Sequence, residues 1–289
     1  PAKGVEKGHR RPSRRGSLLT TVMESTGGGR GKRLVMEMDS VIMVMHERPE
    51  LKAPILIEGL PGVGNVEKLA AEHLVEQVKA VKFADIYSKH FPPQVLLDDD
   101  GVIRLVNNEM HYYRGEGDRP DIVILTGDYQ GMTPDGQYEL SHHAIQACKE
   151  LGVSRIYTLG GYGVGKMVEK PRVLGAVTDI ALCEEMTKHG VIFSKGEPGS
   201  GIVGASGLML GLGKIEGIEA VCLMGETSGY FVDPKGAEAV LKVLMSLLNL
   251  ELDLTALSDK AEQIDLIASK LKEAETTDVP KREDLGYIG

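Results

Sequence analysis

The sequence of 289 residues has no tryptophan and only 4% aromatic residues, so few rings are available to stack on nucleic-acid bases. It also has no apolar run that reaches about eighteen residues, the length that a membrane-spanning helix requires. The core must therefore be built mainly from Val, Ile, Leu, Met and Ala, which supply most of the 42% hydrophobic content. These absences disfavour a membrane protein and a protein that stacks on single-stranded nucleic acid.

Motifs for metal binding and nucleophilic catalysis are missing as well. The three cysteines, Cys148, Cys183 and Cys222, form no CxxC pair, and the eight histidines form no HxxxH or HxH pair. We therefore expect small, buried, unpaired cysteines in a reducing cytoplasm, and we predict no metal site. Ser206 lies in Gly-Ala-Ser-Gly and not in the GxSxG pattern of hydrolases, so no catalytic residue is predicted.

Charge is not spread evenly along the chain. The net charge of −9 opposes nonspecific binding to nucleic acid or to anionic membranes. Residues 1–35 nevertheless contain nine Lys or Arg against two acids, with Ser, Thr and three consecutive glycines between them. This composition predicts a disordered basic extension over residues 1–37. The alternatives for its role are a plain tail, a targeting segment, or a contact arm for RNA or an acidic protein surface.

Apolar strands alternate with amphipathic helices over residues 38–249, which predicts one α/β domain. The expected fold is a three-layer arrangement in which helices cover both faces of a mostly parallel sheet. An Asp-Gly turn at residues 100–101 lies between two apolar runs and predicts a β-hairpin. Strands are expected at 53–58, 95–97, 102–106, 121–126, 155–159 and 223–224, and helices at 66–78, 138–151 and 234–248.

Glycine is abundant, with 36 residues, and glycine-rich turns are expected where successive strands end. Because the carboxyl ends of parallel strands meet at one edge, such turns would line a single crevice, the usual ligand site of open α/β sheets. The strand-end acids Asp128 and Glu226 either bind a ribose or a basic group there, or cap a helix and brace the turn. The candidate ligand-binding residues are Gly62, Gly64, Asn65, Gly127, Asp128, Gly160, Gly163 and Glu226.

Two of these turns come close to known cofactor motifs. Gly62-Val-Gly-Asn-Val-Glu67 has the context of a dinucleotide fingerprint, but Glu67 replaces the third glycine and would repel a pyrophosphate. Gly160 to Lys166 has the GxxxxGK spacing of a phosphate-binding loop, but Met167 stands where a Ser or Thr would bind magnesium. The sequence therefore predicts no cofactor.

Residues 250–274 predict an amphipathic helix with an apolar seam, because Leu254, Leu257, Ala261, Ile264, Ala268 and Leu271 are spaced alternately by three and four. This seam either folds back on its own domain or packs between subunits. The remaining residues, 275–289, predict an exposed tail.

Five segments together resemble the archaeal form of the proteasome assembly chaperone family. They are Glu58-Gly-Leu-Pro-Gly-Val-Gly-Asn65, Leu125-Thr-Gly-Asp128 with Gln130, Leu159-Gly-Gly-Tyr-Gly-Val-Gly165, the glycine-rich run from Gly199 to Gly213, and Met224-Gly-Glu-Thr-Ser-Gly-Tyr230 with Val232-Asp-Pro234. The resemblance extends from about residue 41 to 271.

This resemblance implies a fold similar to nucleoside phosphorylases and hydrolases. It also implies a homo-oligomer that binds proteasome α-subunits during ring assembly without ATP, or that binds another assembly factor. The chain ends in Gly-Tyr-Ile-Gly, with Tyr287 one position earlier than in docking tails of the hydrophobic-Tyr-any type. Leu285, Tyr287 and Ile288 are therefore candidates for packing on a partner. The alternative function is a phosphorylase-like enzyme or sensor for a nucleoside-like or carboxylated molecule at the glycine turns.

Overall fold

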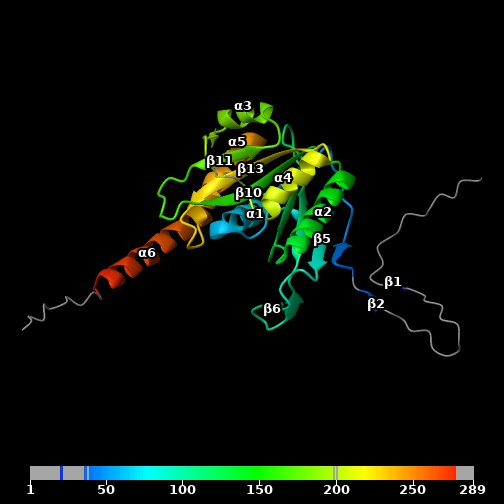
Figure 1. The fold of residues 1–289 in the computed structure, drawn as a ribbon, viewed down its shortest axis with the longest axis horizontal. Coiled ribbons are helices and arrows are strands. Elements are labelled where there is room, and N and C mark those ends of the chain that lie inside the picture. The colour runs from blue at the N-terminus through cyan, green and yellow to red at the C-terminus, as the bar shows by residue number, and fades with distance from the viewer. Residues whose placement is uncertain (1–19, 22–35, 38, 198, 200, 278–289) are drawn as a thin grey trace, which may run out of the picture.

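The computed structural model describes residues 20–21, 36–37, 39–197, 199 and 201–277, and its main feature is a single large sheet. In the described chain this sheet has nine strands in the order β12-β11-β13-β10-β4-β9-β8-β5-β3 (Figure 1). The strands are β3 (Val41–Met45), β4 (Ile55–Gly59), β5 (Val81–Ser88), β8 (Asn108–Tyr113), β9 (Ile122–Gly127), β10 (Arg155–Gly163), β11 (Val173–Val177), β12 (Val191–Ile192) and β13 (Glu219–Thr227).

The sheet is mixed, which corrects the prediction of a mostly parallel one. Its centre, β13-β10-β4-β9, is parallel throughout, but β8, β5 and β3 on one side and the β11–β13 pair on the other are antiparallel. The prediction failed because β3, β5, β8 and β11 were not recognised in the sequence. The parallel centre was recognised because its strands are almost continuously apolar, as strands covered on both faces are.

Helices cover both faces of this sheet. The longer helices are α1 (Val66–Gln77), α2 (Pro134–Leu151), α4 (Ala205–Ile215), α5 (Pro234–Leu248) and α6 (Thr255–Thr277), and the shorter ones are α3 (Ala181–Lys188) and the 3-10 turn η1 (Val63–Asn65). Helices α2 and α4 lie together on one face, and α1 and α5 lie together on the other (Figure 1). Each pair encloses its own apolar core against the sheet.

Two helix starts follow familiar capping chemistry. Thr133 accepts a hydrogen bond from Gly136 N at 3.1 Å at the start of α2, and Asp233 does the same for Gly236 N at the start of α5. A proline occupies the first turn of both helices. The predicted start of α2 at residue 138 was therefore too late, because the Thr-Pro signal lies before the apolar periodicity.

Two glycine-rich runs that were expected as turns are regular structure. Strand β10 continues through Gly163, paired with β13 as far as Thr227, and Gly207 lies inside helix α4. Glycine serves close packing at these positions. A Cβ on Gly161 would overlap the backbone oxygen of Val63, and one on Gly207 would overlap that of Ile202.

The predicted hairpin forms outside the main sheet, where β6 (Val95–Leu97) pairs antiparallel with β7 (Ile103–Leu105). It projects from the body beneath β5 in Figure 1. Helix α6 packs its first turns on α5, with Leu257 and Ala261 buried. Of residues 1–37, β1 (Thr20–Thr21) and β2 (Met36–Glu37) form an antiparallel pair. The rest of that predicted extension, and Leu285, Tyr287 and Ile288 of the predicted tail, lie outside the described residues.

Cys148 and Cys222 are buried, and burial raises the pKa of each thiol to about 12, whereas Cys183 is partly exposed. Within the portion of the chain that the structure describes, no helix is both long enough and apolar enough to cross a membrane.

Candidate functional site

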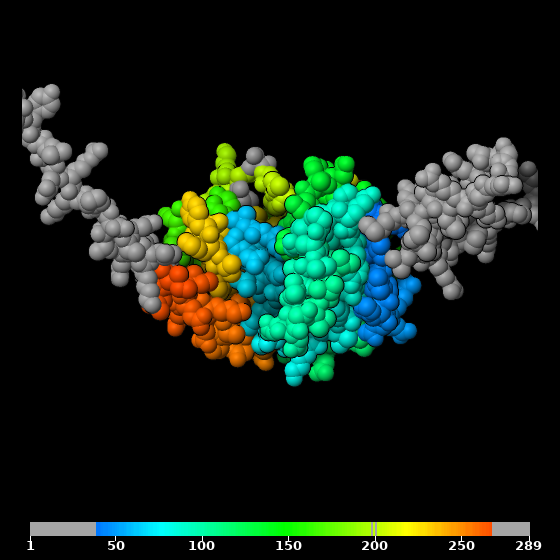
Figure 2. All heavy atoms as spheres, turned by 90° about the horizontal axis from the view of Figure 1, so that it is seen from below, coloured from blue at the N-terminus to red at the C-terminus, as the bar shows by residue number. Residues whose placement is uncertain are grey.

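The carboxyl ends of the four parallel strands meet at one edge of the sheet, which we call the carboxyl edge. Strands β4, β9, β10 and β13 end there at Gly59, Gly127, Gly163 and Thr227. All candidate ligand-binding residues lie at or next to these strand ends. From below, the β6–β7 hairpin (cyan-green) and the loop after β13 (yellow) reach the surface on either side of the blue start of α1 (Figure 2). The structure thus brings the predicted residues to one edge of the sheet.

The crevice expected between the glycines is filled by the loop before α1. A Cβ on Gly64 would lie 2.5 Å from Thr227 Oγ1, and Gly161 leaves room only for the backbone of Val63. Gly64 (φ +66°) and Asn65 (φ +53°) adopt the left-handed conformation, which turns the chain sharply into the helix. Gly64 O also accepts a hydrogen bond from Asp233 N at 2.8 Å. The η1 loop is therefore bound to β10, β13 and the start of α5.

The other candidate glycines also contact protein atoms. A Cβ on Gly62 would overlap the carboxylate of Glu67, and one on Gly127 would overlap Asn108. A Cβ on Gly160 would lie 3.1 Å from Met224 Cγ, and one on Gly163 would lie 3.5 Å from Val63 Cγ1. Small residues at these positions let the chain close on itself, so the space that a phosphate would need in the predicted crevice is occupied by the protein.

Two buried carboxyl groups that the sequence reasoning did not connect lie behind this loop. Glu58, at the end of β4, is fully buried and accepts a hydrogen bond from Leu60 N at 3.0 Å. Burial raises the pKa of Glu58 to about 7, against the opposing effect of its hydrogen bonds. Its second oxygen lies 3.1 Å from Ser206 Oγ, which lies 2.9 Å from Leu159 O. A serine hydroxyl has one proton, so Ser206 donates to one of these two oxygens at a time unless Glu58 is itself protonated and donates to it.

Glu67, in the first turn of α1, is the second buried acid. Burial raises its pKa to about 8, and the charge of Glu58 adds to the increase. Its Oε2 atom is buried without a hydrogen-bond partner. Together Glu58 and Glu67 form an acid pair that favours the protonated state near neutral pH. An acid that interrupts the otherwise apolar strand Ile-Leu-Ile-Glu-Gly is the signal in the sequence that could have revealed this pair.

Asp128 is bound by an arginine from the hairpin. Arg104 Nη1 and Nη2 donate to its two oxygens at 2.6 and 2.9 Å, and Asn107 N donates at 3.1 Å. Burial acts to raise the pKa of Asp128, but the hydrogen bonds outweigh it and lower the pKa. The bidentate pair fastens the base of the β6–β7 hairpin to the end of β9.

Glu226 is bound in a similar way on the other side of the edge. Arg172 Nε donates to Glu226 Oε1 and Arg172 N donates to Oε2, both at 2.9 Å. The hydrogen bonds from Arg172 lower the pKa of Glu226. It lies within β13 and not in a turn, and it joins that strand to the start of β11. Of the two roles expected for Asp128 and Glu226, the structure displays the bracing one.

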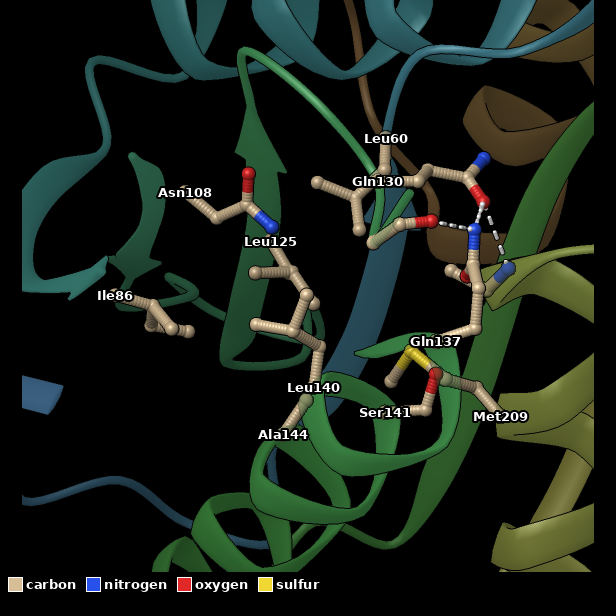
Figure 3. Close-up of a pocket in the computed structure, with 12 residues that line it drawn as sticks. Leu60, Ile86, Asn108, Leu125, Gln130, Gln137, Leu140, Ser141, Ala144 and Met209 are labelled. Atoms are coloured by element: carbon tan, nitrogen blue, oxygen red, sulfur yellow. Dashed lines mark hydrogen bonds between the residues drawn. The ribbon is translucent and has the colours of Figure 1, made fainter. Parts of the chain in front are cut away.

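Gln130 connects the loop after β4 to two helices. Its Nε2 donates to Pro61 O at 2.9 Å, and its Oε1 accepts from Ala205 N at 2.9 Å and from Gln137 Nε2 at 3.1 Å. These contacts lie beside a cavity lined by Leu125, Leu140 and Met209 among others (Figure 3). The cavity volume of about 10 Å³ is at the lower limit of the space that one water molecule needs. Ser141 Oγ, which lines it, is buried without a protein partner and could bind such a water.

The described residues contain no group of three or more His, Cys, Asp or Glu side chains placed to hold a metal ion. The carboxyl edge is a tightly packed surface whose acids are neutralised by protons or by arginines. Its geometry suits the presentation of fixed loops more than the enclosure of a small molecule.

Comparison with known protein families matches residues 56–272 to the PAC2 family. An uncharacterised protein of Methanocaldococcus jannaschii is 42% identical over 246 residues, which cover 83% of this chain and 93% of that protein. The crystal structure of Pyrococcus furiosus PbaB, described as an archaeal proteasome activator, is similar at 42% identity and a TM-score of 0.78. That similarity covers 81% of this chain and 100% of PbaB.

Pyrococcus furiosus PbaA, described as an archaeal homolog of proteasome-assembly chaperone, is similar at 26% identity and a TM-score of 0.68. The similarity covers 83% of this chain and 94% of PbaA. These matches confirm, at the level of the family, the resemblance drawn from the five glycine-containing segments. The more specific likeness to the phosphorylase fold stays a prediction.

Proposed function

This chain belongs to the PAC2 family, and we propose that it is a cytoplasmic assembly chaperone or scaffold for the proteasome. In this proposal it self-assembles and binds proteasome α-subunits without ATP. The observation that carries the proposal is the similarity along most of the chain to PbaB, described as an archaeal proteasome activator, and to PbaA, described as an archaeal homolog of proteasome-assembly chaperone.

The carboxyl edge supports a scaffold over an enzyme. The candidate glycines accommodate the protein's own atoms, and the two strand-end acids are bound by Arg104 and Arg172. An enzyme of the phosphorylase type would need an open space and free polar groups at this edge. The alternative of an enzyme or sensor for a nucleoside-like or carboxylated molecule stays a prediction with less support.

The proposal is tested by mixing the purified chain with cognate α-subunits in the absence of nucleotide. Native mass spectrometry should detect complexes that contain both proteins, and α-rings should form faster than from α-subunits alone. A chain that ends at residue 277 would show whether Leu285, Tyr287 and Ile288 contribute to binding. If the full-length chain forms no complex with α-subunits, the proposal is wrong.

A second candidate is activation of the assembled proteasome, which is favoured by the 42% identity to PbaB. The same preparation distinguishes the two roles. An activator raises the rate of peptide hydrolysis by complete 20S particles, whereas an assembly chaperone accelerates ring formation and leaves that rate unchanged.

A further inference from the structure

The β6–β7 hairpin exposes an unusual amount of apolar surface. Leu97, Ile103 and Leu105 are 69, 62 and 60% exposed, and Val95 and Val102 are exposed beside them. A pair of three-residue strands is at most marginally stable alone in water, and contiguous exposed apolar surface commonly marks an interaction site. The hairpin is therefore a candidate surface for binding a partner.

Polar contacts hold this hairpin in a fixed position. Arg104 lies in β7, and its guanidinium binds Asp128 through two hydrogen bonds and Asn107 Oδ1 through a third at 3.0 Å. Asn107 Nδ2 in turn donates to Asp85 Oδ1 at 2.6 Å. The apolar side chains are thus presented to solvent by an anchored base and do not fold back onto the body of the protein.

A second exposed apolar surface lies at the other end of the carboxyl edge. We call it the edge patch; its members are Val63, Met167, Tyr230, Phe231 and Val232, all exposed. Met167, Phe231 and Val232 line a common small cavity beside α6, and Val63 packs against Gly229. The patch joins the loops that follow β4, β10 and β13, whereas the hairpin joins β5 to β8. In Figure 2 the hairpin and the loop after β13 are separate, so neither covers the other within one copy.

The charges beside these two surfaces are opposite. The hairpin turn has three consecutive exposed acids, Asp98, Asp99 and Asp100. The edge patch has exposed Lys166 and Lys170 on the loop that also contains Met167, against one exposed acid there, Glu169. One surface is therefore apolar with an acidic border, and the other is apolar with a basic border. Such complementarity orients a contact and disfavours a pairing of like surfaces.

We propose that the β6–β7 hairpin of one copy docks on the edge patch of a second copy of this chain. This inference rests on the self-assembly part of the proposed function and adds the two surfaces that make the contact. Leu97 and Ile103 pack against Met167 and Phe231 of the other copy, and the acidic turn lies near its lysines. Because the two surfaces differ, each copy presents one hairpin and one edge patch for such contacts.

The test uses full-length chains that differ only at exposed positions. The hairpin variant carries Leu97→Asp and Ile103→Asp, and the patch variant carries Met167→Asp and Phe231→Asp. Ile180→Asp with Ile215→Asp is the matched control, because these side chains are 83 and 80% exposed but belong to neither surface. Native mass spectrometry and light scattering should show an oligomer for the unmodified chain and the control. Each of the other two variants should self-associate about 30-fold or more weakly.

Mixing the two defective variants sharpens the test. The patch variant retains a good hairpin and the hairpin variant retains a good patch, so the mixture should form a 1:1 complex that neither variant forms alone. Reversing the hairpin charges with Asp99→Lys and Asp100→Lys should weaken association, and Lys166→Glu with Lys170→Glu in the same chain should restore it. Unchanged thermal unfolding of each variant would show that the effects arise from association and not from misfolding.

The possible failures are distinguishable. An oligomer that withstands both the hairpin and the patch variants would overturn this inference and leave self-assembly intact. Loss of the oligomer in the hairpin variant alone, with no 1:1 complex in the mixture, would overturn the pairing with the edge patch. A monomeric unmodified chain that still binds α-subunits would overturn the inference and self-assembly together, but not the proteasome-related function.

Discussion

The acidic side chains of the carboxyl edge have pKa values that are shifted in opposite directions in its inner part and on its two flanks. In the inner part, Glu58 and Glu67 are buried without a cation, and their pKa values are raised to about 7 and about 8. On the flanks, Asp128 and Glu226 are bound by arginines, and their pKa values are lowered. The inner acids are neutralised by protons beneath the η1 loop, whereas the outer acids are neutralised by cations that fasten a hairpin and a strand.

This difference shows what each region contributes. The inner part is tightly packed, because its glycines leave room for backbone atoms of the chain itself. The flanks hold segments that expose apolar side chains to solvent. Substitutions that alter the inner acids and not the outer ones, or the reverse, should therefore separate effects on stability from effects on association.

The largest expected effect is the pH dependence of the inner acids. Their pKa values are higher in the folded state than the ordinary value of 4.5, so the folded state binds more protons than the unfolded state between these values. The corresponding stability is fully present below pH 4.5 and is lost as the pH rises through about 7 and 8. The loss should be on the order of 3–5 kcal/mol for each group.

Glu67→Gln should remove much of this dependence and should make the protein more stable than the unmodified chain at about pH 8. Urea unfolding at several pH values measures the effect. Glu251→Gln, at a side chain that is 93% exposed, is the control. Parallel stability profiles for Glu67→Gln and the unmodified chain would contradict the assignment of a protonated acid pair.

The next largest effect is expected from a substitution that disturbs the packing of the η1 loop over the inner acids. Gly161→Ala should destabilise the protein by about 1–3 kcal/mol, because the added Cβ displaces the backbone at Val63. Gly211→Ala is the matched control, since Gly211 lies in α4 with nothing within 4 Å of its Cβ position. That change should be neutral or stabilising by up to about 1 kcal/mol. Equal effects of the two substitutions on thermal unfolding would show that close packing at Gly161 is unimportant.

A smaller effect is expected at Ser206. Ser206→Ala removes the hydroxyl that links Glu58 to Leu159 O and should destabilise the protein by about 1–2 kcal/mol. Because the hydrogen bond from Ser206 lowers the pKa of Glu58 and so favours its ionised form, the cost should be greater at about pH 8 than at pH 5. Ser206→Cys, which retains a weak donor and acceptor, should lose less. A cost that does not vary with pH would argue against a hydrogen bond between Ser206 and Glu58.

The smallest effect on stability is expected on a flank. Arg104→Met should cost about 1 kcal/mol or less at neutral pH, because the Arg104 side chain is largely exposed to solvent. The stability that this pair adds is present above the ordinary pKa of Asp128, 3.8, and is lost as the pH falls, which is the opposite sign to the inner acids. Hydrogen exchange in residues 95–105 should nevertheless rise clearly. Unchanged exchange there would show that the Arg104–Asp128 pair does not hold the hairpin.

Sequence patterns were informative where local chemistry dominates. The Asp-Gly turn predicted the β6–β7 hairpin, and apolar periodicity predicted α1 and α5 to within a residue or two. The strands that the sequence analysis missed include β5, which contains Lys82 and Asp85, and β8, which contains Asn108 and His111. Polar residues alternate with apolar ones or are buried in these strands, so their sequences resemble those of loops. Hydrogen bonds to distant residues satisfy groups such as Asp85, which accepts from Asn107 Nδ2, and no local pattern reveals them.

The sequence by itself determined the parallel centre of the sheet, the row of strand ends and the family. Each of these depends on residues close together in the chain: apolar runs, glycines and their order. Only the tertiary structure decided what the row of strand ends does, because that depends on which atoms approach the glycines from distant segments. Val63 fills the space beside Gly161, Ser206 meets Glu58 across 148 positions, and Arg104 binds Asp128. A glycine in the sequence indicates space, and only packing shows whether a ligand or the protein itself occupies it.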